Sequence, residues 1–266
     1  MTTSLYGWTA LVTGAGRGIE RGIALELARA GVALALVARS VDELAATKDR
    51  IEGLGGSALA IRADLGDLDE VTRVVGFANG ELGTVDVLVN NAAVVWPLGP
   101  SVMVDPAEWR ASITVNVVAA AALSFALMPG MLDRGWGRIV NVSSGVAAHP
   151  EVMIGGNAYA SSKAALEAHT INLAAELTGS GVTVNAFRPG SVDTAMQAWI
   201  RKQDPARVGA ELHERFDRSY REGSLITPDQ SASSLLAHLS SAATGEIWDV
   251  SDSHPATGTH PGQVPV

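Results

Sequence analysis

The feature that most constrains the fold of this 266-residue chain is a repeated alternation of short apolar runs with longer segments of helical periodicity. The apolar runs are predicted strands at 9–12, 32–37, 58–63, 85–89, 138–142, 182–187 and 247–250. Strands that are apolar on both faces are typical of parallel sheets covered by helices on both sides. The alternation therefore predicts one α/β, doubly wound domain built on a mainly parallel seven-stranded sheet.

Between these runs, helices are expected at 19–30, 41–54, 67–82 and 158–178, two more between about 105 and 134, and one from Pro228. Two segments fall outside the alternation. Residues 195–223 are charged and helical, and we expect a helical lid over a substrate, or a solvated amphipathic helix pair. Residues 253–266 are rich in Pro, Gly and Thr and are expected to form a surface tail, so that the domain spans 1–252.

Composition excludes several classes of function. The net charge is −9 and no basic cluster stands apart from acids, so neither a nucleic acid nor a membrane surface is an expected partner. The chain contains no cysteine, which excludes disulfides and thiolate chemistry and is consistent with a cytoplasmic location. The N-terminus lacks a signal-peptide pattern.

The apolar segment 113–132 contains Asn116 and Pro129 and is predicted to be a buried helix. The six histidines show no metal-binding spacing, so no metal is expected.

A glycine-rich turn follows the first predicted strand. Its sequence is Thr13-Gly14-Ala15-Gly16-Arg17-Gly18-Ile19-Glu20, with the spacing T-G-x-x-x-G. Such a turn before a helix presents free backbone N–H groups and the positive helix end to a pyrophosphate, as in Rossmann-type folds. An ordinary glycine-rich turn is the alternative interpretation.

The second strand ends at Arg39 rather than at an acidic residue. An acid at this point would bond an adenosine ribose and repel a 2′-phosphate. Arg39 and Arg17 can instead hold that phosphate, because guanidinium groups match phosphate oxygens. Unless both are simply solvated arginines, the pattern favours NADP(H) over NAD(H).

Tyr159 and Lys163 open the long alanine-rich helix at a spacing that places them on one face. A cation about 4 Å away, at an effective dielectric of ~20, contributes up to ~4 kcal/mol and lowers a tyrosine pKa by as much as about three units. Ser144 follows the fifth strand, where a hydroxyl either bonds a substrate carbonyl or serves turn formation. Asn116 lies inside a helix and either produces a kink that holds water or is satisfied by neighbouring backbone.

Together these motifs resemble those of the short-chain dehydrogenases/reductases, from Thr9 to about Val250. The elements that carry the resemblance occur in the order T-G-x-x-x-G, Asp64, Asn90-Asn91-Ala92-Ala93, Asn116, Ser144, Tyr159-x-x-x-Lys163 and Pro189-Gly190-Ser191-Val192-Asp193-Thr194. The resemblance implies an NADP(H)-dependent oxidoreductase that forms a homotetramer or homodimer, with the small residues around 119–122 and 164–175 allowing close packing between subunits.

The resemblance also implies residue roles. Tyr159 is the implied general acid/base, Ser144 positions the substrate oxygen, Lys163 binds the nicotinamide ribose and lowers the tyrosine pKa, and Asn116 holds a relay water. The implied cofactor-binding residues are Gly14, Gly16, Arg17, Gly18, Ile19, Arg39, Asp64, Leu65, Asn91, Ala92, Ala93, Tyr159, Lys163, Pro189, Gly190, Val192 and Thr194.

Three positions depart from the family pattern. Glu20 replaces the third glycine of the turn and brings a carboxylate towards the expected pyrophosphate. Ala93 replaces a glycine. Ser144 and Tyr159 are two residues farther apart than usual, which we attribute to an insertion within the loop 149–156.

Apolar residues are the expected walls of the substrate pocket: Trp96, Pro97, Leu98, Val152, Met153, Ile154, Met196 and Trp199. They predict a hydrophobic ketone, aldehyde or secondary alcohol as the small-molecule substrate. Two other functions stay open: a cofactor-impaired binding or assembly protein, suggested by Glu20, and a lyase or epimerase on the same fold.

Overall fold

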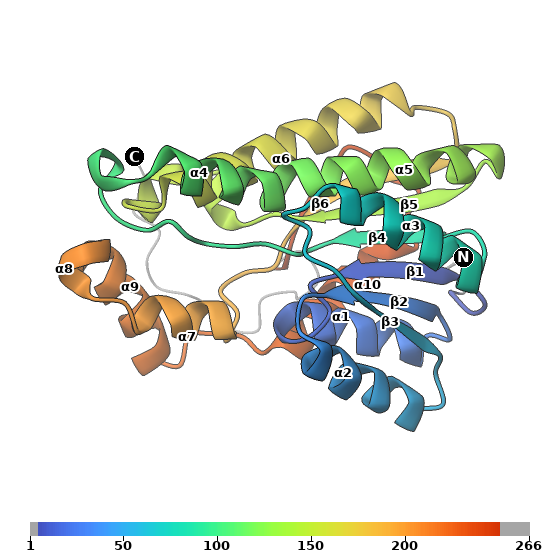
Figure 1. The fold of residues 1–266 in the computed structure, drawn as a ribbon, viewed down its shortest axis with the longest axis horizontal. Coiled ribbons are helices and arrows are strands. Elements are labelled where there is room, and N and C mark those ends of the chain that lie inside the picture. The colour runs from blue at the N-terminus through green and yellow to red at the C-terminus, as the bar shows by residue number, and fades with distance from the viewer. Residues whose placement is uncertain (1–4, 251–266) are drawn as a thin grey trace, which may run out of the picture.

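The computed structural model describes residues 5–250, which contain a single seven-stranded sheet (Figure 1). The strands are β1 (Thr9–Thr13), β2 (Ala33–Ala38), β3 (Ala58–Arg62), β4 (Val87–Asn90), β5 (Gly137–Val142), β6 (Val182–Arg188) and β7 (Ile247–Asp249). Every neighbouring pair is parallel, and the order is β3-β2-β1-β4-β5-β6-β7. The predicted doubly wound α/β fold is confirmed.

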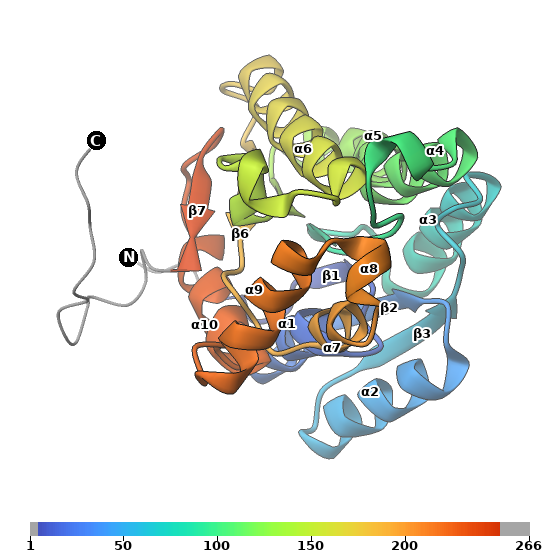
Figure 2. The same ribbon diagram turned by 90° about the vertical axis from the view of Figure 1, so that its left-hand side faces the viewer.

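Helices cover both faces of the sheet (Figure 2). They are α1 (Gly18–Arg29), α2 (Val41–Gly53), α3 (Asp69–Leu82), α4 (Pro106–Ile113), α5 (Ala119–Asp133), α6 (Asn157–Glu176), α7 (Ala195–Arg201), α8 (Pro205–Val208), α9 (Ala210–Arg221) and α10 (Pro228–Leu239). Helices α1, α2 and α10 pack on one face around Ile23, Leu36 and Leu235. Helices α3, α5 and α6 pack on the other around Leu88 and Leu123. The strands are apolar throughout because each contributes side chains to both layers.

The segment 106–133 differs from the two separate helices expected. A single π-helical turn, η2 (Thr114–Val118), joins α4 to α5 into one continuous helix with Asn116 buried at the widened turn. This helix is long and apolar enough to cross a membrane, but Leu123, Leu127 and Met131 pack into the core beneath it. The expectation of a core helix therefore matches the packing.

The insertion after β6 forms α7, α8 and α9, which stand across the carboxyl ends of the strands (Figures 1 and 2). Its inner side shares a small apolar core with the loops after β4 and β5, including Leu98, Met153, Ile200, Val208 and Leu212. The insertion is helical, as expected. The expected surface tail, 253–266, lies outside the described residues.

Two glycines beside β6 provide a test of backbone packing. Gly179 and Gly181 both have φ of +82°, but a Cβ on Gly181 would lie 1.9 Å from the carbonyl oxygen of Gly135, whereas one on Gly179 would have no atom within 4 Å. We expect Gly179→Ala to cost about 1 kcal/mol of unfolding free energy from the left-handed backbone alone. Gly181→Ala should cost at least ~2 kcal/mol more, because the clash is with backbone. Urea unfolding of both variants measures the difference, and equal losses would contradict the packing argument.

Candidate active site

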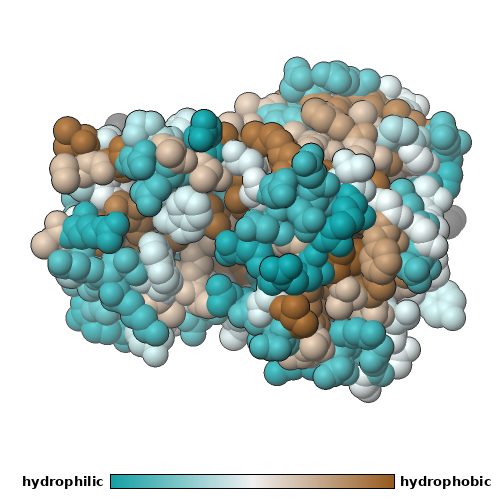
Figure 3. Space-filling view, viewed as in Figure 1, coloured by the Kyte–Doolittle hydropathy of each residue, from teal (hydrophilic) through white to brown (hydrophobic). Residues whose placement is uncertain are grey.

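Three adjoining cavities run along the carboxyl ends of the strands, and the surface is hollowed between α7–α9 and the rest of the molecule (Figure 3). We call them the outer, central and inner cavities. The outer and central cavities share Arg17, Glu20 and Arg39. The central and inner cavities share Tyr159 and Thr194, among others. The three form one crevice, which lies where open α/β sheets bind ligands.

Most of the predicted cofactor-binding residues line this crevice. The outer cavity holds Gly14, Arg17, Arg39, Asp64, Leu65, Ala92 and Ala93. The central cavity adds Gly18, Ile19, Asn91, Tyr159, Lys163, Pro189 and Thr194, and the inner cavity adds Gly190 and Val192. Gly16 is the exception. It faces α2, where an added Cβ would lie 2.8 Å from Glu43, so its lack of a side chain serves helix packing.

The glycine-rich turn is folded around a carboxylate. Gly14 and Gly18 have φ of +77° and +68°, and a Cβ on Gly18 would lie 2.8 Å from Oε2 of Glu20. The Glu20 side chain therefore bends back over the turn, where it hydrogen-bonds the side chain of Asn91. Burial raises the pKa of Glu20 to about 7, against the opposing effects of hydrogen bonds and of the cations Arg17 and Lys163. An acid thus occupies the cradle predicted for phosphate.

The two predicted arginines differ in their partners. Arg17 forms an ion pair with Glu43, with 3.2 Å between Nη1 and Oε1. Arg39 is exposed and has no ion-pair partner among residues 5–250. In the outer cavity, the guanidinium of Arg39 is therefore available to a ligand, whereas that of Arg17 is already paired with Glu43.

Tyr159 and Lys163 lie on the same side of α6 and both line the central cavity. The Lys163 Nζ lies 5.6 Å from the centroid of the Tyr159 ring and donates to the Val142 carbonyl at 2.7 Å. The Tyr159 side chain hydrogen-bonds that of Ser144, which reaches the inner cavity from the end of β5. The structure thus brings together the phenol, the ammonium and the serine hydroxyl expected from the sequence.

The pKa of Tyr159 differs from the sequence-based expectation. Burial raises it, the hydrogen bond from Ser144 lowers it, and the charge of Glu20 raises it again. Burial also lowers the pKa of Lys163, to about 8, although Glu20 and Glu167 act in the opposite direction. Desolvation is the largest cause of both shifts, because both groups lie inside the protein.

Asn116 lies behind the crevice and does not line it. Its Oδ1 accepts from the Val94 N–H at 2.8 Å, and its Nδ2 donates to the Val94 carbonyl at 2.8 Å and to the Ser162 hydroxyl at 2.9 Å. Of the two interpretations, the side chain satisfied by backbone is the one that the structure shows. Asn116 ties the loop after β4 to α6.

A buried ionic cluster beneath the crevice was not foreseen. Arg188, at the end of β6, donates to both carboxylate oxygens of Glu167 at 2.8 Å, and Ser143 donates to the same carboxylate at 2.7 Å. The one available sequence signal was the position of Glu167, one helical turn after Lys163. The cluster fixes α6 to the ends of β5 and β6.

Of the eight predicted pocket residues, Pro97 and Leu98 line none of the three cavities, and the other six divide into three groups. Met153 and Met196 line the inner cavity, and Trp96 and Trp199 line the central one. Val152 and Ile154 are wrong predictions: they are 38% and 62% exposed and line none of the three cavities, because the short helical turn η4 (Pro150–Met153) directs only Met153 inwards. The inner cavity also contains residues that the sequence did not single out: Val95, Val146, Gln197, Ile200, Arg215, Phe216 and Ser219. Five of them come from α7 and α9, and in the sequence the inward faces of these helices are indicated only by amphipathic spacing.

Comparison with known proteins bears directly on the family. The family model described as short chain dehydrogenase matches residues 8–205. A short chain dehydrogenase of Pseudocercospora fijiensis is 40% identical over 73% of this chain, and the match spans 62% of that relative. A solved structure assigned as an NAD(P)-dependent gluconate 5-dehydrogenase from Beutenbergia cavernae, with NADP bound at low occupancy, is 36% identical, with a TM-score of 0.81 over 94% of this chain and 97% of that one.

A variant of actinorhodin polyketide ketoreductase, solved with NADPH, is 29% identical, with a TM-score of 0.81 over 94% of this chain and 97% of that one. The matches to the family model and to full-length structures agree with the sheet order and with the crevice. This chain belongs to the short-chain dehydrogenase/reductase family.

Proposed function

We propose that the protein is a cytoplasmic, NADP(H)-dependent carbonyl reductase or alcohol dehydrogenase that acts on a largely hydrophobic ketone, aldehyde or secondary alcohol. The observation that carries the proposal is the position of the Tyr159 phenol. It lies where the central and inner cavities meet, bonded to Ser144 and one helical turn from Lys163. A general acid at this junction can reach a carbonyl in the inner cavity from beside a nucleotide in the central one.

The crevice offers groups that fit a dinucleotide. Gly18 borders the central cavity without a side chain, Asp64 borders the outer cavity, and Arg39, which has no ion-pair partner among residues 5–250, is available for a 2′-phosphate. Both solved relatives were solved with NADP or NADPH, which supports the choice of NADP(H) over NAD(H). When bound, NADPH supplies a hydride to the carbonyl carbon.

The chain's own residues handle the proton. Ser144 donates a hydrogen bond to the substrate oxygen and holds it against the phenol of Tyr159. The phenol gives its proton to that oxygen as the negative charge develops there, and the Lys163 ammonium stabilises the phenolate left behind. Because burial raises the pKa of Tyr159, the phenol is fully protonated at neutral pH and is ready to act as an acid in the direction of carbonyl reduction. The helices α7–α9 cover the inner cavity and act as its lid.

Removing the acid tests this mechanism. Tyr159→Phe should bind NADPH with an affinity within about threefold of the parent, yet lose at least ~100-fold in kcat, the contribution typical of a general acid. Initial rates with NADPH and NADH on aliphatic and aromatic ketones measure both the loss and the cofactor preference. Near-normal turnover by the variant would refute the assignment. The absence of net NADPH oxidation with every carbonyl would favour a lyase or epimerase instead.

The position of Glu20 supports a second candidate, a family member with impaired cofactor binding that serves as a binding or assembly protein. Its carboxylate lies over Gly14 and Gly18, where a pyrophosphate would approach the turn. Fluorescence titration with NADPH separates the two functions. Saturable binding below about 1 mM supports the enzyme, and no saturation in that range supports the second candidate.

The charge of Glu20 should make cofactor affinity depend on pH. Because the pKa of Glu20 is raised to about 7, the side chain is mostly neutral at pH 6 and mostly negative at pH 8. NADPH affinity should therefore fall by about tenfold over this range, equivalent to ~1.4 kcal/mol of charge repulsion. Glu20→Gln and Glu20→Gly should bind more tightly at pH 8 and lose this part of the pH dependence.

The matched control is Glu26→Gln, which removes an acid on α1 that pairs with Arg29 and lines none of the three cavities. This variant should retain the parental profile, including any contribution from the cofactor's own phosphate. If Glu20→Gln follows the same curve as Glu26→Gln, the carboxylate does not oppose the cofactor.

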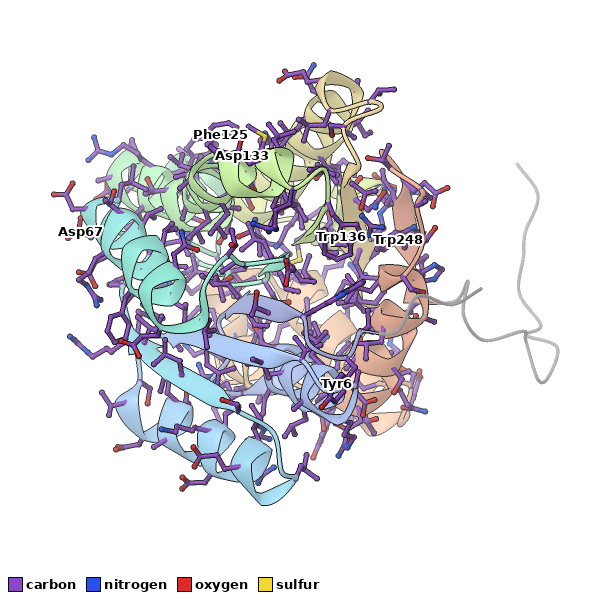
Figure 4. The ribbon with its side chains drawn as sticks, turned by 90° about the vertical axis from the view of Figure 1, so that its right-hand side faces the viewer. Tyr6, Asp67, Phe125, Asp133, Trp136 and Trp248 are labelled. Atoms are coloured by element: carbon purple, nitrogen blue, oxygen red, sulfur yellow. The ribbon has the colours of Figure 1, made fainter. Side chains whose placement is uncertain are left out.

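We also infer a homotetramer or homodimer formed through the outer face of α5 and α6. Phe125 projects from α5 and is 52% exposed (Figure 4), and it packs edge-on against His169 of α6. On α6, Ile171 is 47% exposed, and three alanines at helical spacing from it, Ala164, Ala168 and Ala175, are exposed as well. The expectation for 119–122 needs correction, because Ala119 and Ala120 face the protein's own core. An apolar helical face of this kind is typical of subunit contacts.

Phe125→Asp should shift the assembly towards the monomer, because a carboxylate in the centre of an apolar contact loses its hydration. Sedimentation velocity at micromolar concentration measures the change. Phe77→Asp is the control, since Phe77 is 45% exposed on α3, away from this face. A parent protein that sediments as a monomer would contradict the inference.

A further inference from the structure

The inner cavity contains a guanidinium that the proposed chemistry does not use. Arg215 reaches the cavity from the inward side of α9, next to Phe216 and one turn before Ser219. One of its amino groups donates to the Val152 carbonyl in the turn η4, on the opposite rim. Burial lowers the pKa of the Arg215 guanidinium, which stays a cation because arginine is not deprotonated in proteins. The cavity therefore holds a fixed positive charge.

This charge has no counter-ion within the described part of the chain. Arg215 forms no ion pair with any residue between 5 and 250, whereas its two neighbours on the solvent side of α9 do. Arg218 lies 3.7 Å from a carboxylate oxygen of Glu214, and Arg221 lies 2.8 Å from both Glu214 and Asp217. Although Arg215 is exposed as a whole, the cavity wall partly desolvates its guanidinium, and a bound anion would offset that cost.

A second polar group in the cavity also lacks a partner. The Oε1 atom of Gln197, on α7, is buried and has no hydrogen-bond donor among the described residues. This amide oxygen is a hydrogen-bond acceptor, and it adds a second polar group to the cavity that Arg215 lines. The cavity also has apolar walls, which include Val95, Val146 and Met153. We call the side formed by α7 and α9, which carries Arg215 and Gln197, the charged end of the cavity.

We propose that Arg215 binds a carboxylate of the substrate, so that the substrate is an oxo acid, or the matching hydroxy acid, with an apolar body. This inference rests on the proposed function, because it places the reacting carbonyl at Ser144 and Tyr159. Arg215 is the one charged residue among those described that line the inner cavity. A single cation matches a carboxylate monoanion better than a phosphate dianion, and the planar guanidinium can engage both carboxylate oxygens.

The test compares acids with esters of identical chain length. The substrates are straight-chain methyl ketones that end in a carboxylate, with about two to six methylene groups between the two functions, and the methyl ester of each. With NADPH, the parent enzyme should show a kcat/KM at least tenfold higher for the acid than for its ester at one or more chain lengths. An alkyl phosphate ketone of the preferred length should be reduced less efficiently than the acid.

The variant Arg215→Met should lower kcat/KM for the preferred acid by about 10- to 100-fold, mainly through KM, and should leave the ester within about threefold. Arg215→Lys should retain part of the preference, because it keeps the charge but loses the planar fork. Arg218→Met is the matched control, an arginine on the outer side of the same helix, and should change neither substrate. NADPH affinity should be unchanged in all three variants, which verifies that they are folded.

Equal efficiency for acids and esters in the parent enzyme would overturn this inference and leave the proposed function standing. Equal losses on acid and ester in Arg215→Met would overturn it as well, because they would mean that Arg215 only supports the shape of the cavity. A preference for the phosphate ketone over the acid would also overturn this inference, because the guanidinium would then bind a phosphate and not a carboxylate. Failure to reduce any carbonyl would overturn the proposed function together with this inference.

Discussion

The ammonium of Lys163 is a charge held inside the protein, and much of the surrounding structure depends on how it is satisfied. The residue is only 2% exposed, and its Nζ donates to the carbonyl of Val142 at the end of β5. An unpaired buried ion costs several kcal/mol, so α6 must lie where this bond can form. One turn later, Glu167 is held by two bonds from Arg188 of β6 and by one from Ser143. These contacts fix the helix that carries Tyr159 against two adjacent strand ends.

The same ammonium links the catalytic helix to the glycine-rich turn. The charges of Glu20 and Lys163 influence each other, because the lysine lowers the glutamate pKa and the glutamate raises the lysine pKa. Burial opposes both effects and brings the two pKa values to about 7 and about 8. An anionic ligand in the central cavity would compete with Glu20 for the positive charge of Lys163 and of Arg17. Glu20 therefore offsets the attraction that the basic groups of this crevice would otherwise exert on phosphate.

The sequence was sufficient for the sheet, the turn and the Tyr159–Lys163 pair, because each depends on local spacing. Strands buried on both faces must be apolar, and residues i and i+4 of a helix must share a face. The sequence was insufficient where the role of a residue depends on which atoms lie next to its side chain in the folded protein. Gly16 is required by α2 rather than by a ligand, and the polar atoms of Asn116 are taken by Val94 and Ser162. The upward pKa shift of Tyr159 likewise depends on its burial, which spacing does not encode.

Chemistry and recognition are separated in this fold. The groups proposed for proton transfer come from β5 and α6, which the buried ion pairs hold rigid, whereas the charged end of the inner cavity comes from α7 and α9. Helix α9 is strongly amphipathic and most of its charged residues are exposed, and only the tertiary structure shows that one of them, Arg215, also lines the inner cavity. The insertion attaches through its small apolar core rather than through the sheet. Substitutions at the inward side chains of the insertion can therefore alter which substrate binds without disturbing the contacts of the buried Lys163.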